Sequence, residues 1–230
     1  MAIVATNPTN FPRRINMYVP AMQYASDVNM LSNTRISFGA PSAGNINNIL
    51  NAQGAATPTT FDLTGNVNAQ TIFEPFGRTI QLVSNVANTN VVNVRGADYL
   101  GQPLVANVTL AGATGVETLK AFKYVDSITV QTGTAGATIS MGWGTSLGLP
   151  YKAMRAIAEI ANGAPVATLG TFVAAVLFDP QTPTTGDPRG LYKPVTVLNG
   201  ANIISVVFDF ANDVNSNVNG GLHGIRQLFA

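Results

Sequence analysis

The 230-residue chain has no cysteine and a single histidine, His223. Without cysteine there is neither a disulfide framework nor a thiolate metal site. A Ser/His/Asp triad would have to use His223, which lies in a Gly-rich tail, and no Gly-x-Ser-x-Gly elbow is present. The phosphate-cradling Gly-x-x-x-x-Gly-Lys-Ser/Thr loop is also missing. A glycosidase would need two facing carboxyls, and the sequence leaves open a pair of Glu74, Glu117 or Glu159 with an aspartate, although no paired arrangement is evident. We therefore expect a non-enzymatic protein without a cofactor.

Charge is scarce as well. Only 10% of the residues are charged and the net charge is +1, whereas soluble domains average about 25% charged. The surface must then be covered largely by amide, hydroxyl and small side chains, which give little electrostatic protection against association. This composition favours a subunit of a permanent assembly, with a monomer of amide-rich surface as the alternative. The nearest approach to a basic run is Arg13-Arg14, so we do not expect nucleic-acid binding.

Long apolar runs are missing too. The longest covers residues 172–178, far short of the about 20 residues that span a bilayer. The N-terminus has no positively charged region followed by an apolar stretch, as a signal peptide would. We expect a chain that is made and used without passing through a membrane and that has no membrane partner.

Short β-branched and aromatic runs, separated by Gly, Asn, Asp or Pro, fill residues 76–143. This pattern is typical of consecutive antiparallel strands. The sequence predicts an all-β protein, an antiparallel β-sandwich or jelly roll. Residues 1–60 are predicted to form an extended arm and linker, residues 61–210 the sandwich core, and residues 211–230 an Asn/Gly-rich, loop-rich tail. The core has a potential division into two sub-sheets near residues 146–164.

Several segments need individual predictions. Residues 150–163 fit either a helical stripe or a strand, and Asn162-Gly163 favours a strand that ends in a hairpin. Residues 169–178 are predicted to form a long strand buried on both faces. Residues 195–198 and 203–210 are predicted to pair as a hairpin.

Three further segments have shorter predictions. Residues 45–50 suggest one helical turn, and residues 52–60 a linker. Residues 213–224 resemble a calcium loop but have Val218 and Gly224 where Gly and Glu are required. The sequence favours a solvated, turn-forming segment, with a bound cation as the alternative.

Two segments are candidates for partner contact. The arm carries apolar and basic side chains, of which we single out Phe11, Arg13, Arg14, Tyr18 and Tyr24. They line the protein's own core or lie on a neighbouring subunit, and the sequence does not choose.

The second candidate is the loop at residues 186–192. It is either a β-turn clamped by Asp187 and Arg189 or a loop that grips a partner through these two residues.

Residues 76–210 resemble a β-sandwich type found in structural proteins of tailed bacteriophages. The resemblance rests on turn and core positions that recur in that group. They are Gly96, Asp98 and Gly101, then Lys120, Phe122, Lys123, Val125, Ser127, Ile128 and Val130, then Ala135, Gly136 and Gly142, and finally Asp187, Arg189, Gly190, Tyr192 and Pro194.

The resemblance implies a virion component on the capsid surface, made in the host cytoplasm. A capsid cement or decoration protein fits best, with the major capsid protein and further copies of itself, as a dimer or trimer, as partners. The alternatives are a tail, head-to-tail connector or fibre-base protein, a shell-forming jelly-roll capsid protein, and a carbohydrate-binding or depolymerising β-domain. The last has only Trp143 and scattered tyrosines from which to build an aromatic platform.

Overall fold

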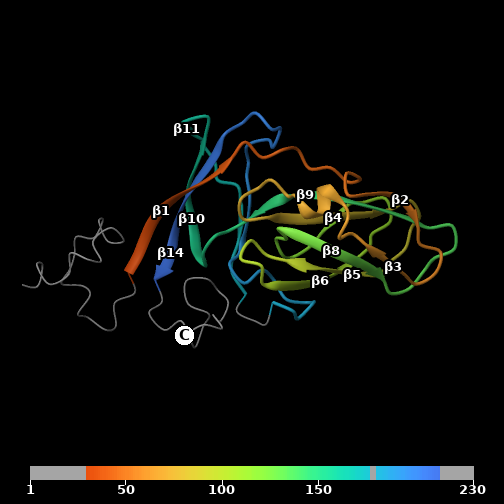
Figure 1. Ribbon diagram of the computed structural model, residues 1–230. Coiled ribbons are helices and arrows are strands. Elements are labelled where there is room, and N and C mark those ends of the chain that lie inside the picture. Colours follow the sequence, from red (N-terminus) through yellow and green to blue (C-terminus); the bar gives the residue numbers. More distant parts are fainter. Residues whose placement is uncertain (1–29, 177–179, 213–230) are drawn as a thin grey trace, which may run out of the picture. The chain divides into compact units, whose positions relative to one another are not determined.

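The computed structural model describes residues 30–176 and 180–212, and these are almost entirely β (Figure 1). The predicted all-β class with antiparallel sheets is confirmed, while the jelly-roll variant stays a prediction. One short helix in these ranges, α1 (Val67–Gln70), begins where the Asn66 side chain accepts a hydrogen bond from the amide of Ala69. The strands are β1 (Met30–Gly39), β2 (Leu50–Gly54), β3 (Thr59–Asp62), β4 (Arg78–Ser84), β5 (Val91–Ala97), β6 (Pro103–Thr109), β7 (Val116–Glu117), β8 (Tyr124–Val130), β9 (Thr138–Gly148), β10 (Ala153–Ala161), β11 (Ala164–Pro165), β12 (Thr171–Val173), β13 (Leu191–Lys193) and β14 (Ile204–Asn212).

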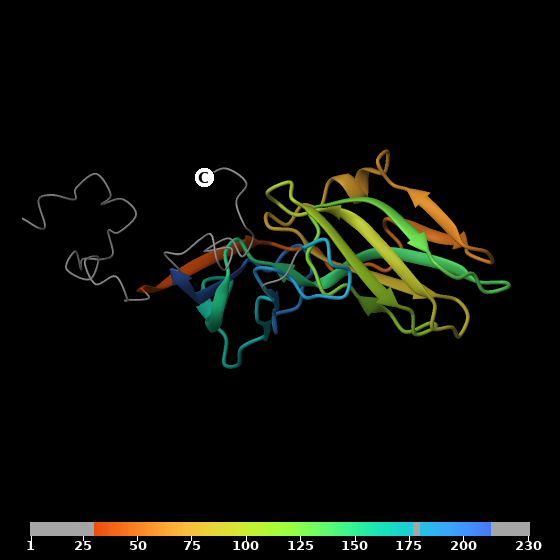
Figure 2. The ribbon, with the colours of Figure 1, turned by 90° about the horizontal axis from the view of Figure 1, so that it is seen from below.

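The strands form three sheets. Sheet A has the order β1-β14-β10-β11, so the first described strand lies beside the last (Figures 1 and 2). Sheet B has the order β12-β13-β9-β4-β7, and β2 also pairs with β9. Sheet C has the order β3-β8-β5-β6. All registers between named strands that the structure describes are antiparallel.

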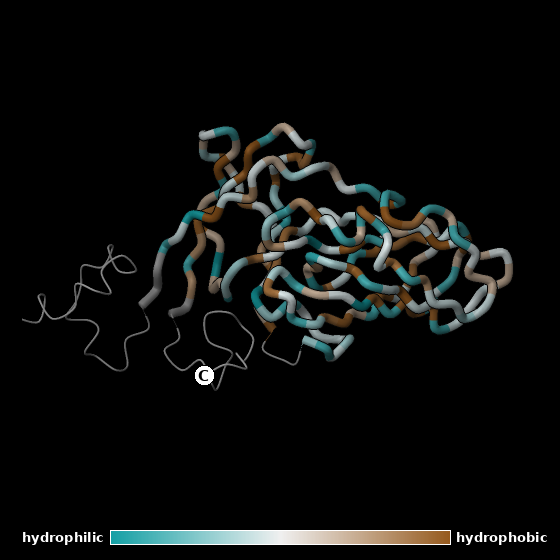
Figure 3. Tube along the Cα trace, viewed as in Figure 1, coloured by the Kyte–Doolittle hydropathy of each residue, from teal (hydrophilic) through white to brown (hydrophobic). Residues whose placement is uncertain are grey.

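Sheets B and C enclose the main hydrophobic core. In several strands alternate residues point inward, as in β6, where Leu104, Ala106 and Val108 are buried and the residues between them are not. Figure 3 shows this alternation as brown and teal segments along the sandwich strands. In β8 the buried Val125 and Ile128 are three residues apart. The pairing with β5 shifts there, leaving Asp126 as the extra residue of a bulge.

Strand β9 belongs to two cores. Its first half contributes Ile139 and Met141 to the sandwich core. Its end contributes Leu147 to a second cluster, formed mainly with sheet A, in which Val206 and Phe208 of β14 are fully buried. The end of β9 thus connects the sandwich core to the second cluster, while the division expected near residues 146–164 stays a prediction.

The segment 150–163 is a strand, as the Asn-Gly signal predicted. Strand β10 runs to Ala161, turns at Asn162 and Gly163, and returns as β11. Both turn residues have positive φ, 51° and 85°. A two-residue type I′ hairpin requires positive φ at both turn residues, and Asn followed by Gly adopts these values with little backbone strain.

The long strand predicted for residues 169–178 is wrong. Within the described residues 169–176 the strand is limited to β12, because the positions that would pair beyond Val173 are Gly190 and Arg189, which form a turn with Asp187. Leu169 and Val173 are 43% and 47% exposed, so the described part of the run is not buried on both faces.

The hairpin predicted from residues 195–198 and 203–210 is also wrong. Strand β14 forms, but its two edges are already occupied by β1 and β10. The amides of Val195 and Thr196 donate instead to the carboxylate of Glu159.

Two smaller predictions near the N-terminal end of the described chain also fail. Residues 45–50 form no helical turn, because the amides of Asn45 and Ile49 donate to carbonyls of β9. The linker predicted at residues 52–60 contains the end of β2 and the start of β3.

Candidate functional site

The loop after residue 180 is held by a buried ion pair. Arg189 donates through Nη2 to the carboxylate of Asp98, and the two side chains are 2% and 0% exposed. The guanidinium also lies over the ring of Tyr99, 4.9 Å from its centroid. Burial raises the pKa of Tyr99 to about 12, although the charge of Arg189 opposes this. Asp98 also accepts hydrogen bonds from the amides of Leu100 and Gln102, which folds the turn between β5 and β6.

Asp187 closes the same loop. Its carboxylate accepts from the amides of Arg189 at 2.8 Å and Gly190 at 3.1 Å, which forms a tight turn. It also accepts from the amide of Ala121 at 2.9 Å, which ties the turn to the chain before β8. Burial raises the pKa of Asp187, and Arg189 together with the three amides opposes that rise.

Lys120 fixes the first part of the loop. Its ammonium donates to the carbonyls of Val105, Pro180 and Thr182, each at 2.7 Å, and the residue is fully buried. Next to these contacts the amide of Asn107 donates to the carbonyl of Pro183 at 2.8 Å. The loop therefore lies along the outer edge of β6 and satisfies backbone groups that an uncovered edge strand would present to other chains.

Asp98, Lys120, Asp187 and Arg189 together form what we call the loop latch. Its two cations and two carboxylates balance, as buried charges require. All four belong to the positions that carry the phage resemblance, so segments far apart in the sequence fasten the same loop through separate contacts. The β-turn interpretation of residues 186–192 agrees with this geometry. Asp187 and Arg189 are each 2% exposed, so a partner contact through either side chain would require the loop to open.

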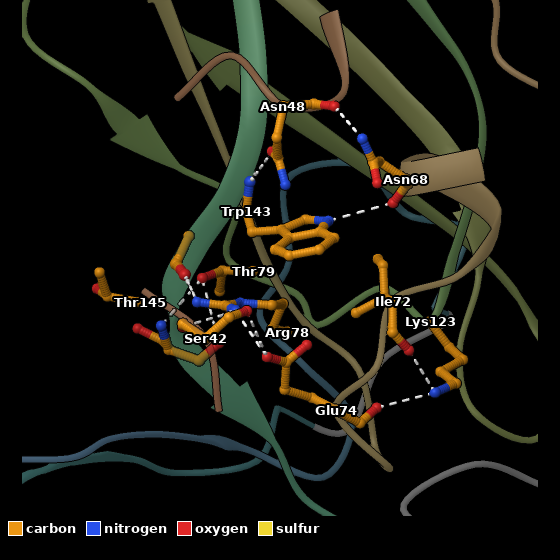
Figure 4. A network of polar contacts seen from close by, with 12 residues as sticks. Ser42, Asn48, Asn68, Ile72, Glu74, Arg78, Thr79, Lys123, Trp143 and Thr145 are labelled. Atoms are coloured by element: carbon orange, nitrogen blue, oxygen red, sulfur yellow. Dashed lines mark hydrogen bonds and ion pairs between the residues drawn. The ribbon is translucent and has the colours of Figure 1, made fainter. Parts of the chain in front are cut away.

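A second polar network lies beside Trp143 (Figure 4). Arg78 is fully buried and donates to Glu74 at 2.7 Å, to the carbonyl of Ser42 at 3.2 Å and to the carbonyl of Gly144. Its guanidinium lies 5.8 Å from the centroid of the Trp143 ring. Burial lowers the pKa of Arg78, and the charge and hydrogen bond of Glu74 partly offset this.

Glu117 is the second carboxylate near Arg78. It accepts from the amide of Thr145 at 3.0 Å, from the hydroxyl of Thr145 at 2.6 Å and from the hydroxyl of Thr79. Burial raises the pKa of Glu117, but the hydrogen bonds from Thr145 and Thr79 outweigh burial and leave the pKa below its usual value. Glu159, in sheet A, is held similarly by Tyr192 and two amides. Each glutamate is thus engaged by groups of its own chain.

A cavity of about 420 Å³ adjoins the Glu74–Arg78 pair and is lined by residues 37–42 and 73–75. One oxygen of Glu74, Oε2, and the Nε of Arg78 are buried without a hydrogen-bond partner. Beside Glu74, the ring of Phe73 is 73% exposed and packs edge-on against Trp143. Neither this cavity nor the Glu74–Arg78 pair was predicted from the sequence. The sequence feature that could have indicated the pair is the Glu-x-x-x-Arg spacing of Glu74 and Arg78. Here this spacing lies in a turn and not in a helix.

Phe11, Arg13, Arg14, Tyr18 and Tyr24 lie outside the described residues, as does the calcium-like segment 213–224. In the described ranges no cluster of three or more acidic or histidine side chains could hold a metal ion. No helix in those ranges is long and apolar enough to cross a membrane.

Comparison with family models, with curated proteins and with solved structures finds no match. The phage resemblance therefore rests on the residues named above.

Proposed function

We propose that the chain is a non-enzymatic structural subunit of a tailed-phage virion, a cement or decoration protein of the capsid. It binds the major capsid protein and bridges neighbouring capsomers. The observation that carries this proposal is the loop latch. Asp98, Lys120, Asp187 and Arg189 belong to the pattern that resembles phage β-sandwich proteins, and all four are buried and fasten the same loop. This supports reading the pattern as a structural unit and not as scattered coincidences.

The surface supports the same proposal. Large apolar side chains are more than half exposed at several places, including Val67 at 74%, Phe73 at 73% and Val197 at 71%. With only 10% charged residues, such a surface suits a subunit whose faces are covered in an assembly. The affinity of each copy can be modest, because many copies repeated over one shell act together.

The test is the location and copy number of the protein in purified particles, measured by quantitative mass spectrometry against the major capsid protein. A cement protein is expected in a fixed ratio to the capsid protein over the whole shell. A tail, connector or fibre-base protein would be present in only a few copies per particle. Absence from particles would overturn the proposal.

A further inference from the structure

We propose that the cavity beside Glu74 and the adjoining edge of β1 receive the arm of a second copy of this chain, with Arg13 and Arg14 seated against Glu74. This inference rests on the proposed function, in which copies lie side by side.

The cavity wall contains an unsatisfied hydrogen-bond acceptor. Glu74 lines the cavity, and its Oε2 is buried without a hydrogen-bond partner and requires a donor. An extended peptide that carries an arginine supplies this donor through its guanidinium. Because Glu74 lines the cavity wall, a small rotation of its carboxylate turns the free oxygen toward an incoming donor.

The walls suit the residues that precede Arg13. Phe38, Pro41, Phe73 and Pro75 surround the cavity, and aromatic and proline faces of this kind bind proline-containing extended segments. The arm reads Phe11-Pro12-Arg13-Arg14, and this is the only place in the chain where two arginines are adjacent. Glu74 already pairs with Arg78 through Oε1, so its second oxygen, Oε2, is the acceptor for the cationic segment.

The edge of β1 leads into the cavity. Its residues 37–39 are both the end of the strand and part of the cavity wall. Strand β1 lies at the end of the order of sheet A, and among the described residues no further strand pairs with it between Arg35 and Gly39. An extended segment can therefore add to this edge as another strand and deliver its end to the cavity.

The reach of the arm fits this geometry. The chain between Arg14 and Met30 spans about 50 Å when extended, and the ten residues of β1 span about 33 Å. The arm is thus long enough to lie along the β1 edge between Arg35 and Gly39 and to reach the cavity. A shell holds neighbouring copies close together, so a linker of this length gives the arm a high effective concentration at the cavity of the neighbouring copy. The arrangement is a form of domain swapping, in which protomers exchange an identical element.

The chain has no cysteine, so crosslinking gives a clear test. One full-length variant carries Ala40→Cys and another carries Ile15→Cys, and Ala40 is an exposed cavity residue. After mixing and mild oxidation, we expect a disulfide-linked heterodimer on a non-reducing gel. Its yield should fall at least about fivefold when Glu74→Gln is added to the Ala40→Cys chain, since a charged hydrogen bond is lost. The matched control Asp62→Asn removes an exposed carboxylate of sheet C and should leave the yield unchanged.

The inference fails if the two single-cysteine variants form no heterodimer. A third variant carries both cysteines in one chain. The inference also fails if this variant forms an intrachain disulfide while the mixed single-cysteine variants form none, because the arm then occupies the cavity of its own chain. A protein that fails in either way yet still occurs over the whole shell would leave the proposed function standing.

Discussion

The Asp98–Arg189 pair is buried almost completely and sits over the Tyr99 ring. A pair of this kind adds little net stability compared with a well-packed apolar replacement, but losing one partner leaves an uncompensated charge in the interior. The pair therefore acts as a specific fastening between the β5–β6 turn and the loop at residues 186–190. The free energy of unfolding should therefore fall more when one of the two charges is removed than the same change costs after the other charge has already been removed.

The variant Asp98→Asn should lower the free energy of unfolding by about 3–5 kcal/mol, because it keeps the shape of the side chain but removes the buried carboxylate that pairs with Arg189. The double variant Asp98→Asn with Arg189→Gln should cost less than the sum of the two single changes. Urea unfolding followed by tryptophan fluorescence measures all three. Strictly additive costs would show that the two side chains do not act as a pair.

Glu117 makes stability depend on pH in a defined direction. The pKa of Glu117 is lowered in the folded chain from a reference value of 4.5 by hydrogen bonds from Thr145 and Thr79, against burial. The unfolded chain therefore binds more protons below about pH 4.5, so stability is complete above that pH and is lost as pH falls through the folded pKa. In Glu117→Gln the loss of unfolding free energy between about pH 7 and about pH 3 should be smaller than in the unmodified chain. An equal loss in both would contradict this role.

At the scale of elements, the loop at residues 180–183 protects an edge. Lys120 holds it by three carbonyls, and the loop covers the outer edge of β6. An edge strand without such cover is a site for association between chains.

Lys120→Met keeps the length and the apolar stem of the side chain but removes its three donated hydrogen bonds. We expect a lower thermal midpoint and concentration-dependent association, which differential scanning fluorimetry and light scattering would detect. Lys193→Met, at an exposed lysine of β13, is the control and should change neither. If Lys120→Met remains monodisperse and as stable as Lys193→Met, the loop does not protect the edge.

Gly96 marks the closest approach of β5 to β8. A Cβ placed there would lie 2.0 Å from the carbonyl oxygen of Tyr124, next to the bulge at Asp126. Gly96→Ala should therefore destabilise the chain by at least about 1–3 kcal/mol, the cost of forcing extra atoms into a packed site. Gly54→Ala, where nothing lies within 4 Å, should be nearly neutral. Equal unfolding curves for the two variants would disprove the constraint.

Local pattern predicted the elements well where one face of a strand is buried. The alternation in β6 and the Asn162-Gly163 turn are properties of neighbouring residues, so sequence alone shows them. The apolar run from residue 172 failed because strand length depends on the partner, and β13 is short. The loop latch and the Glu74–Arg78 network depend on residues up to 91 positions apart, and their meeting follows from topology, which no local pattern contains.

At the scale of the whole molecule, the arm is where the function and the further inference converge. The triple variant Phe11→Ala, Tyr18→Ala and Tyr24→Ala should weaken binding to shells, because apolar and aromatic anchors carry most of the energy of an interface. Its unfolding free energy should stay within about 0.5 kcal/mol of the unmodified chain if these residues do not belong to the protein's own core. Co-sedimentation with undecorated shells measures binding, and urea unfolding measures stability. Normal decoration by the triple variant would eliminate the arm as the bridging element. A large loss of stability would place these side chains in the chain's own core instead.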